Sequence, residues 1–399
     1  MSGRLTSFLS PRSKSTPSTS PRIRDLSGLG SCRESTVPPA RHPTRASAGP
    51  PDTPAWRAKL IRRKRLCAAL VTPLSGPLAR YGRSGATALR LWATEAGLDL
   101  AIADAYPSAA AAVASVAGHR VDVLFGPYGA GPAVAAARAA PSVLWNHGGA
   151  SARLVRQAFP HVVNVPAPAA TYLAAVIGAL DAAELAGAQA VLLHSRTGFG
   201  REVAGGALAA ASDVGLAVTA IPFDPGDGDG AARSVQGRGA DVLLVAGGFD
   251  DELAIAARLL CRRWRAVAFV AAGVDEVLAP VADRLTGVYG PCQWLPGAAP
   301  QPEDGPDSSW FTAAYLQAAG SPPPYPAAAA FAAGVLWQRC TRDAGDTVPE
   351  AVQAAAVRLT TTTLFGTFRL DPVTGLQEGH RVGVVQWRRG RRQIITPPS

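Results

Sequence analysis

The sequence predicts an α/β protein with two similar open lobes, each built on a parallel sheet. Between residues 66 and 289, short apolar runs alternate with Ala-rich segments of helical length, as is typical of parallel strands covered by helices on both faces. A strand followed by a glycine-containing loop also recurs after about 120 residues: 66–71 is matched by 189–194, and 121–129 by 240–248. Two tandem lobes would place their ligand-binding loops at the carboxyl ends of the strands.

The individual elements follow from the same alternation. The expected strands are 66–71, 98–103, 121–125, 142–145, 161–165, 189–194, 217–222, 240–246, 267–271 and 286–289. The expected helices are 82–95, 107–118, 131–140, 168–186, 200–214 and 250–263, then 308–319, 326–343 and 347–359 after a Pro-rich loop. Two last apolar runs, 382–387 and 393–395, flank an Arg-rich stretch and predict a hairpin with a solvated turn.

The net charge of +10 is unevenly distributed. Residues 1–66 hold 14 of the 39 Lys and Arg residues but only three of the 29 acids, so the remaining chain carries 25 basic and 26 acidic residues. A nearly neutral body argues against nucleic-acid binding, which requires a surface that neutralises phosphates. No run reaches the ~18 apolar residues of a membrane-spanning helix. We therefore expect a protein that neither binds nucleic acid nor spans a membrane.

Recognisable catalytic and metal sites are missing from the sequence. The five cysteines form no C-x-x-C pair, and none of the six histidines is close in sequence to another. No lysine follows Lys64, which excludes a P-loop lysine from the body. The segment Asn146–Ser151 is similar to the His-Gly-Gly loop of esterases, but the chain has no G-x-S-x-G nucleophile elbow. We therefore expect that the protein is not an enzyme and that it binds neither a metal nor a cofactor.

Residues 1–65 are rich in Ser, Pro, Thr and Arg without apolar periodicity, and we expect them to be disordered. They are either a basic tail with a partner or an upstream extension from an early start codon. Arg62–Arg65 precede an apolar run, Leu66–Val71, that is shorter than the ~7–15 residues of a signal peptide core. Without a clear signal peptide, the sequence as written predicts a cytoplasmic protein.

Six motifs in order resemble the leucine/isoleucine/valine-binding-protein family, the type I periplasmic solute-binding proteins of ABC transporters. They cover essentially all of residues 66–395. The motifs are TPLSGPLARYG (72–82), VDVLFGPYGAGPAVAAA (121–137), SVLWNHGGAS (142–151), VLLHSRTGFGREVA (191–204), VLLVAGGFDDELAIAARL (242–259) and YPAAAAFAAGVLW (325–337).

The resemblance implies a clamshell of two lobes joined by a three-segment hinge, with a small-molecule ligand trapped between the lobes and an ABC permease as partner. The crossings are expected near Val165–Pro168, Pro291–Pro296 and Thr361–Leu364. The first lobe then comprises 66–166 and 296–362, and the second 167–295 and 363–399. Family members are usually extracytoplasmic, whereas the cytoplasmic amide sensors of amidase operons resemble the same fold.

The resemblance also implies a ligand pocket. Backbone N–H groups of Gly129, Ala130, Gly149 and Ala150 would hold a ligand carboxylate or amide oxygen, since small residues allow close approach of the backbone. The hydroxyl group would come from Ser151. Aromatic contacts are expected from Tyr81 in the first lobe and from Phe199 and Phe249 in the second.

One departure from the family pattern affects the expected ligand. Members that bind α-amino acids usually place a second-lobe carboxylate against the ligand ammonium group, and Gly273 stands at that position here. Asp250, Asp275 or Glu276 could take the role only in a shifted register or a rearranged loop. The expected ligand is thus a branched-chain or other amino acid, or an amide, with a less polar or aromatic ligand equally open. An importer component and a cytoplasmic amide or amino-acid sensor both fit the sequence.

Overall fold

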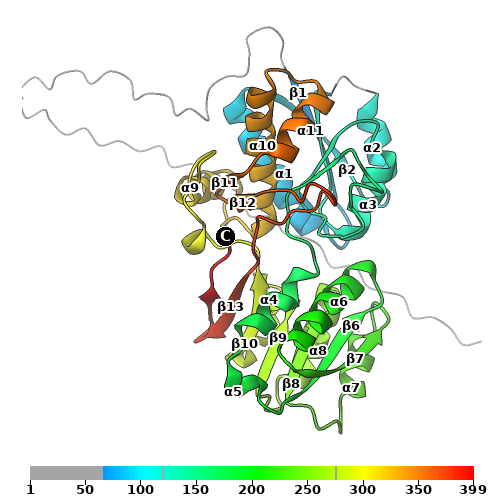
Figure 1. The fold of residues 1–399 in the computed structure, drawn as a ribbon, viewed down its shortest axis with the longest axis vertical. Coiled ribbons are helices and arrows are strands. Elements are labelled where there is room, and N and C mark those ends of the chain that lie inside the picture. The colour runs from blue at the N-terminus through cyan, green and yellow to red at the C-terminus, as the bar shows by residue number, and fades with distance from the viewer. Residues whose placement is uncertain (1–65, 119–120, 275) are drawn as a thin grey trace, which may run out of the picture. The chain divides into compact units, whose positions relative to one another are not determined.

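The computed structural model describes residues 66–118, 121–274 and 276–399. The expected disorder of residues 1–65 lies outside these ranges. Within them, two parallel-stranded sheets are each covered by helices, as Figure 1 shows, and the predicted α/β class with two lobes is confirmed.

The first sheet has the order β2-β1-β3-β4-β5, with all neighbours parallel. Its strands are β1 Cys67–Thr72, β2 Asp99–Asp104, β3 Val123–Phe125, β4 Leu144–Asn146 and β5 Val162–Asn164. The helices of this lobe are α1 Ala79–Ala96, α2 Ala109–Ala117, α3 Ala130–Ala139, α9 Ser308–Ala319, α10 Tyr325–Ala344 and α11 Pro349–Arg358. A short ribbon of β11 Thr361–Thr363 and β12 Gly366–Phe368 follows α11.

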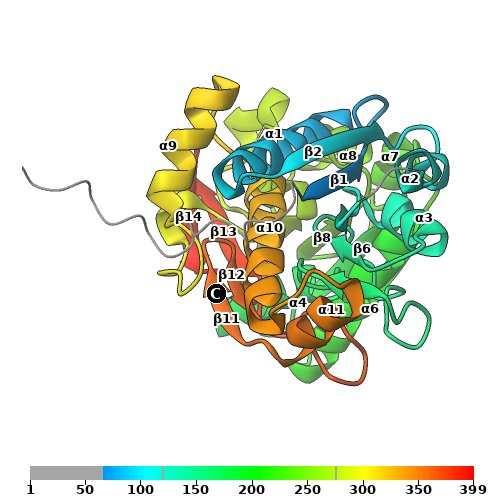
Figure 2. The same ribbon diagram turned by 90° about the horizontal axis from the view of Figure 1, so that it is seen from above.

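Side chains of successive residues in β1 enter two different cores. Ala68 and Leu70 pack with α1 and α10, whereas Ala69 and Val71 pack with α2 and α3. Figure 2 shows the two pairs of helices on opposite sides of the strands. Burial on both faces explains why this strand is an uninterrupted apolar run rather than an alternating one.

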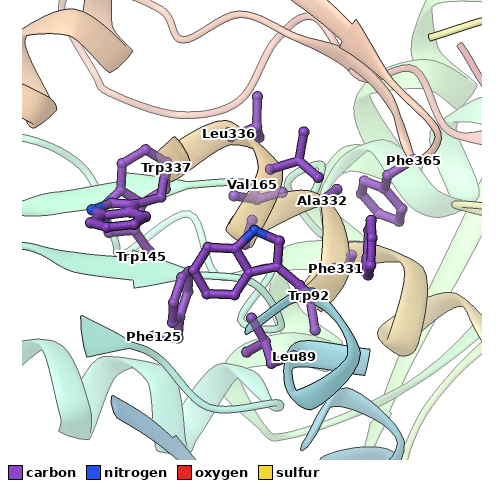
Figure 3. Close-up of a cluster of buried hydrophobic side chains, with 14 of the residues drawn as sticks. Leu89, Trp92, Phe125, Trp145, Val165, Phe331, Ala332, Leu336, Trp337 and Phe365 are labelled. Atoms are coloured by element: carbon purple, nitrogen blue, oxygen red, sulfur yellow. The ribbon is translucent and has the colours of Figure 1, made fainter. Parts of the chain in front are cut away.

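The core beside α1 and α10 is aromatic (Figure 3). The Trp92 ring makes edge contacts with Phe125 and Trp337, with centroid distances of 5.5 Å and 5.9 Å. Gly334 of α10 faces this ring so closely that a Cβ atom there would lie 2.3 Å from Trp92. The glycine thus allows α10 to pack directly on the indole.

The second sheet has the order β14-β13-β10-β9-β8-β6-β7. Its strands are β6 Gln189–Ser195, β7 Ala217–Phe223, β8 Val242–Ala246, β9 Ala266–Phe269, β10 Val288–Cys292, β13 Gly383–Arg388 and β14 Arg391–Thr396. Its helices are α4 Thr171–Ala179, α5 Ala182–Leu185, α6 Gly198–Asp213, α7 Gly228–Ser234 and α8 Phe249–Leu259, with 3₁₀ turns η2 Val270–Gly273, η3 Ala279–Arg284 and η4 Pro296–Ala298 in the connections. Helices α4 and α6 cover one face, and α7 and α8 the other.

The predicted C-terminal hairpin is confirmed. Strands β13 and β14 pair in antiparallel fashion, and β13 also pairs with β10. The turn residues Arg389 and Gly390 have φ values of 52° and 74°, the left-handed conformation that two-residue hairpin turns require.

The chain passes between the two cores at three places. Val165 packs in the first core and Ala167 in the second, and Trp294 returns to the first core directly after β10. Val165–Pro168 and Pro291–Pro296 therefore remain our proposed first two crossings.

The third crossing needs a correction. We expected it at Thr361–Leu364, with 363–399 in the second lobe, but Leu364, Phe365, Phe368 and Leu370 all pack in the aromatic core of the first lobe. Figure 3 shows Phe365 near Phe331 of α10. The first residue to join the second core again is Val382, so we now propose the third crossing between Leu370 and Val382.

Among the described residues, no helix is long and apolar enough to cross a membrane.

Candidate functional site

A cavity of about 540 Å³ lies where the carboxyl ends of the two sheets meet. The loops that follow β3, β4, β6 and β8 all contribute to its wall, together with η2 and the start of α10. Loops at the carboxyl ends of parallel strands are the usual ligand-binding edge of open α/β sheets. Both lobes therefore face one cavity, and its size suits a small organic molecule.

The first lobe contributes the N-terminus of α3. Gly129 and Ala130, two of the residues from which we expect ligand contacts, line the cavity. Gly129 has a φ value of 101°, and no side chain caps the helix, so the N–H groups of Ala130 and Gly131 have no intrahelical partner. Unpaired N–H groups and the positive end of the helix dipole favour an anionic group at this end of the cavity.

The loop after β4 contributes less than expected. Ala150 and Ser151 line the cavity, but Gly149 does not. A Cβ atom on Gly149 would lie 2.2 Å from the Cβ of Ala133, so this glycine allows the loop to pack against α3. Its N–H donates to the side chain of Asn146 at 2.8 Å, which fixes the loop from within.

The Ser151 hydroxyl has a partner that the sequence did not indicate. It donates to Oε1 of Glu202 at 2.8 Å, and the N–H of Ala152 donates to Oε2 of the same carboxylate at 2.8 Å. Glu202 lies in α6, so these bonds join the second lobe to the first. Glu202 lies five residues after the N-cap Thr197, beyond the first turn of the helix, and no signal in the sequence marked it.

Tyr81 does not line the cavity. Its side chain is buried, and its ring lies 5.1 Å from that of Tyr128 and 5.0 Å from that of Phe249, centroid to centroid. Tyr128 and Phe249 line the cavity from opposite lobes. We therefore assign Tyr81 a supporting position behind two lining aromatic rings, in place of the direct ligand contact that we expected.

The second lobe places Phe199 and Phe249 on the wall of the cavity. Phe199 makes an edge contact with Tyr172 of α4 at a centroid distance of 5.9 Å. Asp250 is exposed on the first turn of α8 and does not line the cavity. Glu276 is exposed and pairs with Arg80, while Asp275 lies outside the described residues.

No carboxylate occurs among the described residues that line the cavity. The position at which family members usually carry one is Gly273, and its backbone leaves no room for a side chain. A Cβ atom there would lie 1.6 Å from the carbonyl oxygen of Pro291. The carboxylate that would pair with a ligand ammonium group is thus absent from this position, and the backbone of the loop also leaves no space for one.

The cationic groups of the wall are two arginines. Arg138 of α3 and Arg153 line the cavity with exposed side chains, and neither forms an ion pair within the described part of the chain. Together with the N-terminus of α3, they give the cavity a positive electrostatic character. Arg138 directly follows the motif 121–137 and Arg153 follows the motif 142–151 by two residues, but their direction toward the cavity could not be read from the sequence.

A buried carboxyl group supports the second-lobe loops from outside the cavity. Glu252 of α8 is 1% exposed and accepts hydrogen bonds from the N–H of Gly247 at 2.8 Å and of Ala271 at 2.7 Å. Burial raises the pKa of this group to about 8, against the lowering effect of the two hydrogen bonds, and the neighbouring Asp251 raises it further. Glu252 thereby connects the loop after β8 to η2.

The polar groups of the wall include three tyrosines and an amide. Tyr128, Tyr172, Gln293 and Tyr325 are side chains that line the cavity, and no role was expected for any of them. The hydroxyls of Tyr128 and Tyr325 are 2.7 Å apart, and Nε2 of Gln293 donates to the Tyr172 hydroxyl at 2.6 Å. Tyr325 begins one of the six motifs, but Gln293 lies in the Pro-rich segment, where nothing in the sequence marks it.

Comparisons with known proteins agree with the two-lobed fold. A periplasmic binding protein family model matches residues 68–392. A leucine binding protein, LivK, from Thermotoga maritima is 17% identical with a TM-score of 0.70, covering 82% of this chain and 97% of its own. A solute binding protein from R. palustris in complex with benzoate is 18% identical with a TM-score of 0.69, covering 84% and 98%.

A leucine-, isoleucine-, valine-, threonine- and alanine-binding protein from Brucella ovis, in a closed conformation, is 15% identical with a TM-score of 0.71, covering 84% of this chain and 95% of its own. No curated protein sequence matches the chain.

Proposed function

Because the chain belongs to the periplasmic binding protein family, we propose that it is the solute-binding component of an ABC importer and traps a small organic acid between its lobes. The observation that carries this proposal is the cavity of about 540 Å³ with walls from both lobes. An ABC permease is the partner that the family implies.

Contacts across the cavity supply a closing mechanism. Glu202 binds the loop of Ser151, and Phe249 packs on Tyr81, in each case between a second-lobe and a first-lobe residue. A ligand that touches both lobes gains its full set of contacts only when these surfaces meet. It therefore shifts the equilibrium between open and closed forms by its extra affinity for the closed form.

The wall favours an acid over an α-amino acid. An ammonium group in a desolvated site needs a carboxylate or several strong acceptors, and the described lining has no carboxylate. A carboxylate, in contrast, would meet the N–H groups of α3 and the field of Arg138 and Arg153. The known structures of similar fold include proteins solved with isoleucine and with benzoate, so the fold itself accommodates either class.

Thermal melting of the full chain tests the proposal. The protein is unfolded and refolded to remove bound molecules and then melted with amino acids, aliphatic amides, aliphatic acids and aromatic acids. A compound at ~100 times its Kd adds about 2.7 kcal/mol, a rise of several degrees in Tm. We expect this rise with an acid.

Two glycine variants locate the binding site. Gly131 of α3 lines the cavity, whereas Gly205 of α6 does not. A Cβ atom at either position would meet no atom within 4 Å. Gly131→Trp should fill the cavity and abolish the rise in Tm, whereas Gly205→Trp should retain it. Equal responses of both variants would place binding outside the cavity.

Transport and sensing differ in the cell. Deletion of the gene should reduce uptake of the radiolabelled ligand if the protein serves an importer. Unchanged uptake together with altered expression of neighbouring genes would support the cytoplasmic sensor instead.

The esterase hypothesis from Asn146–Ser151 receives no support from the geometry. Both ring nitrogens of His147 lack a hydrogen-bond partner within the described residues, so this histidine does not activate Ser151. We propose that the protein has no catalytic activity. Turnover of activated esters that disappears in Ser151→Ala would contradict this.

A further inference from the structure

One part of the cavity wall is a polar cluster of neutral side chains. It consists of Tyr128, Tyr172, Gln293 and Tyr325, which come from the loop after β3, from α4, from the second crossing and from the start of α10. Tyr128, Tyr172 and Gln293 are each exposed to 6% and Tyr325 is partly buried. Two hydrogen bonds pair the members, Tyr128 with Tyr325 and Gln293 with Tyr172.

The cluster does not satisfy its own hydrogen-bonding capacity. Oε1 of Gln293 is buried and has no partner among the described residues. The Tyr172 hydroxyl accepts from Gln293, so its own proton remains to be donated. Of the Tyr128 and Tyr325 hydroxyls, one donates to the other, and the acceptor retains a free proton as well.

This arrangement leaves one acceptor and two donors without partners among four side chains that line the same cavity. Turning the Gln293 amide would pair its oxygen with Tyr172 but leave an N–H without a partner, so one amide atom is unsatisfied in either orientation. Buried polar groups are nearly always paired in native proteins, so an unpaired group on a cavity wall needs an explanation, and a bound group that completes its hydrogen bonds supplies one. The complementary group both accepts and donates hydrogen bonds.

We propose that the ligand carries a neutral hydroxyl group that binds Gln293 and Tyr172, at a distance from its carboxylate. This inference rests on the proposed function and specifies its ligand: an aromatic acid with a hydroxyl group on the ring. The ring is favoured because the aromatic side chains of Phe199, Phe249 and Tyr128 line the same cavity.

Charged groups fit this part of the wall poorly. A carboxylate would lie against the unpaired oxygen of Gln293 and would have no cation in the cluster. An ammonium group would find neutral phenols rather than phenolates, since burial raises the pKa of Tyr128, Tyr172 and Tyr325 above the ordinary value. A hydroxyl group meets neither difficulty, because it carries no charge and matches both donor and acceptor.

Calorimetric titration of the full chain tests the inference with benzoate, 3-hydroxybenzoate, 4-hydroxybenzoate and leucine. We expect one hydroxybenzoate to bind at least about tenfold more tightly than benzoate, because sites built to bind a hydroxyl group reject analogues that lack it. In Gln293→Leu this preference should disappear, with benzoate binding unchanged or improved. Gln317→Leu, on the exposed face of α9, is the matched control and should retain the preference.

A second variant covers the case that Gln293→Leu does not fold. Tyr172→Phe keeps the ring and removes only the hydroxyl, and it should also reduce the preference for the hydroxybenzoate. Equal binding of benzoate and both hydroxybenzoates, or an equal loss of all three in the variants, would overturn the inference. Binding of leucine and of no aromatic acid would also overturn it.

The two proposals fail in different ways. If an amino acid or an aliphatic acid alone binds and Gly131→Trp abolishes that binding, the hydroxyl inference fails and the solute-binding function stands. If no compound raises the Tm, or if Gly131→Trp and Gly205→Trp respond alike, the proposed function fails and the inference fails with it.

Discussion

Glu252 provides the sharpest prediction of stability, because it is a nearly inaccessible carboxyl group whose charge state changes near neutral pH. Its side chain is 1% exposed and accepts hydrogen bonds from Gly247 and Ala271. Burial raises its pKa from 4.5 to about 8. In the unfolded chain the group would titrate at its ordinary value, so folding and protonation are linked.

The sign of the effect follows from the direction of the shift. Between pH 4.5 and 8 the folded protein holds a proton on Glu252 that the unfolded chain has released. The contribution of this group to stability is therefore complete below pH 4.5 and is lost as the pH rises through 8. At about 1.4 kcal/mol per pH unit, the loss reaches about 5 kcal/mol as an upper limit.

Two buried histidines act in the opposite direction. Burial lowers the pKa of His147 and of His380 from 6.5 to about 4. Between pH 4 and 6.5 the unfolded chain binds protons that the folded protein does not, so both histidines make stability rise with pH in that range. Above pH 6.5, Glu252 is the one of these three groups that still changes the free energy of unfolding with pH. We expect a maximum near pH 6.5 and a decline of about 2 kcal/mol by pH 8.

Urea unfolding at intervals of half a pH unit from 5 to 9 measures this profile in the wild type and in Glu252→Gln. The variant should lack the decline between pH 6.5 and 8, whatever its stability at a single pH. Glu350→Gln, on the exposed side of α11, serves as the control and should follow the wild type. Parallel declines of the wild type and Glu252→Gln, or a wild type without a decline, would refute the reasoning.

Three further substitutions test other parts of the structure. Glu202→Ala removes two hydrogen bonds between the lobes and should weaken ligand binding by about tenfold or more in calorimetry, with little change in urea unfolding of the unliganded protein. Gly273→Ala forces a Cβ atom against the carbonyl of Pro291 and should destabilise the fold by about 1–3 kcal/mol or more in urea unfolding, unlike the open Gly205→Ala. Trp337→Ala should cost about 3–5 kcal/mol by the same measurement, because the indole is 1% exposed in the core of Figure 3; a loss below 1 kcal/mol would contradict that packing.

The arrangement of strands and helices could be predicted because strands that are buried on both faces of a sheet appear in the sequence as continuous apolar runs. Every residue of β8, Val242–Ala246, is buried, and the sequence shows it as one apolar run between turn residues. The repeat at about 120 residues appears because both lobes place a glycine-containing loop after equivalent strands. Such patterns depend on which residues are apolar and not on how their side chains are oriented.

The third crossing escaped prediction because the apolar residues after the Thr run belong to the first core. Leu364 and Phe365 are consecutive and are separated from Phe368 by Gly366 and Thr367, and so short an apolar stretch does not reveal the core in which it packs. Their core is formed mainly by α1 and α10, which lie at distant points of the chain. Assigning the segment to a lobe requires the tertiary packing.

The candidate site was predictable as a set of loops but not as a set of contacts. Position after a strand brings Gly129, Ser151 and Phe249 to the cavity, because carboxyl ends of parallel strands share one edge. The directions of the side chains could not be predicted from these positions. Tyr81 turns behind Tyr128, and the Ser151 hydroxyl meets a carboxylate from a helix that begins far along the chain.

The charge of the wall leads to a last consequence for binding. Burial raises the pKa of its tyrosines Tyr128 and Tyr172 well above the ordinary value, so these lining side chains remain neutral near physiological pH. Glu252 is the buried group that does change, and it holds Gly247 and Ala271 at the ends of two lining loops. A pH dependence of affinity for a hydroxybenzoate near physiological pH should therefore be absent from Glu252→Gln. If the dependence persists in that variant, a titrating group outside Glu252 controls the site, and the loops are positioned independently of its charge.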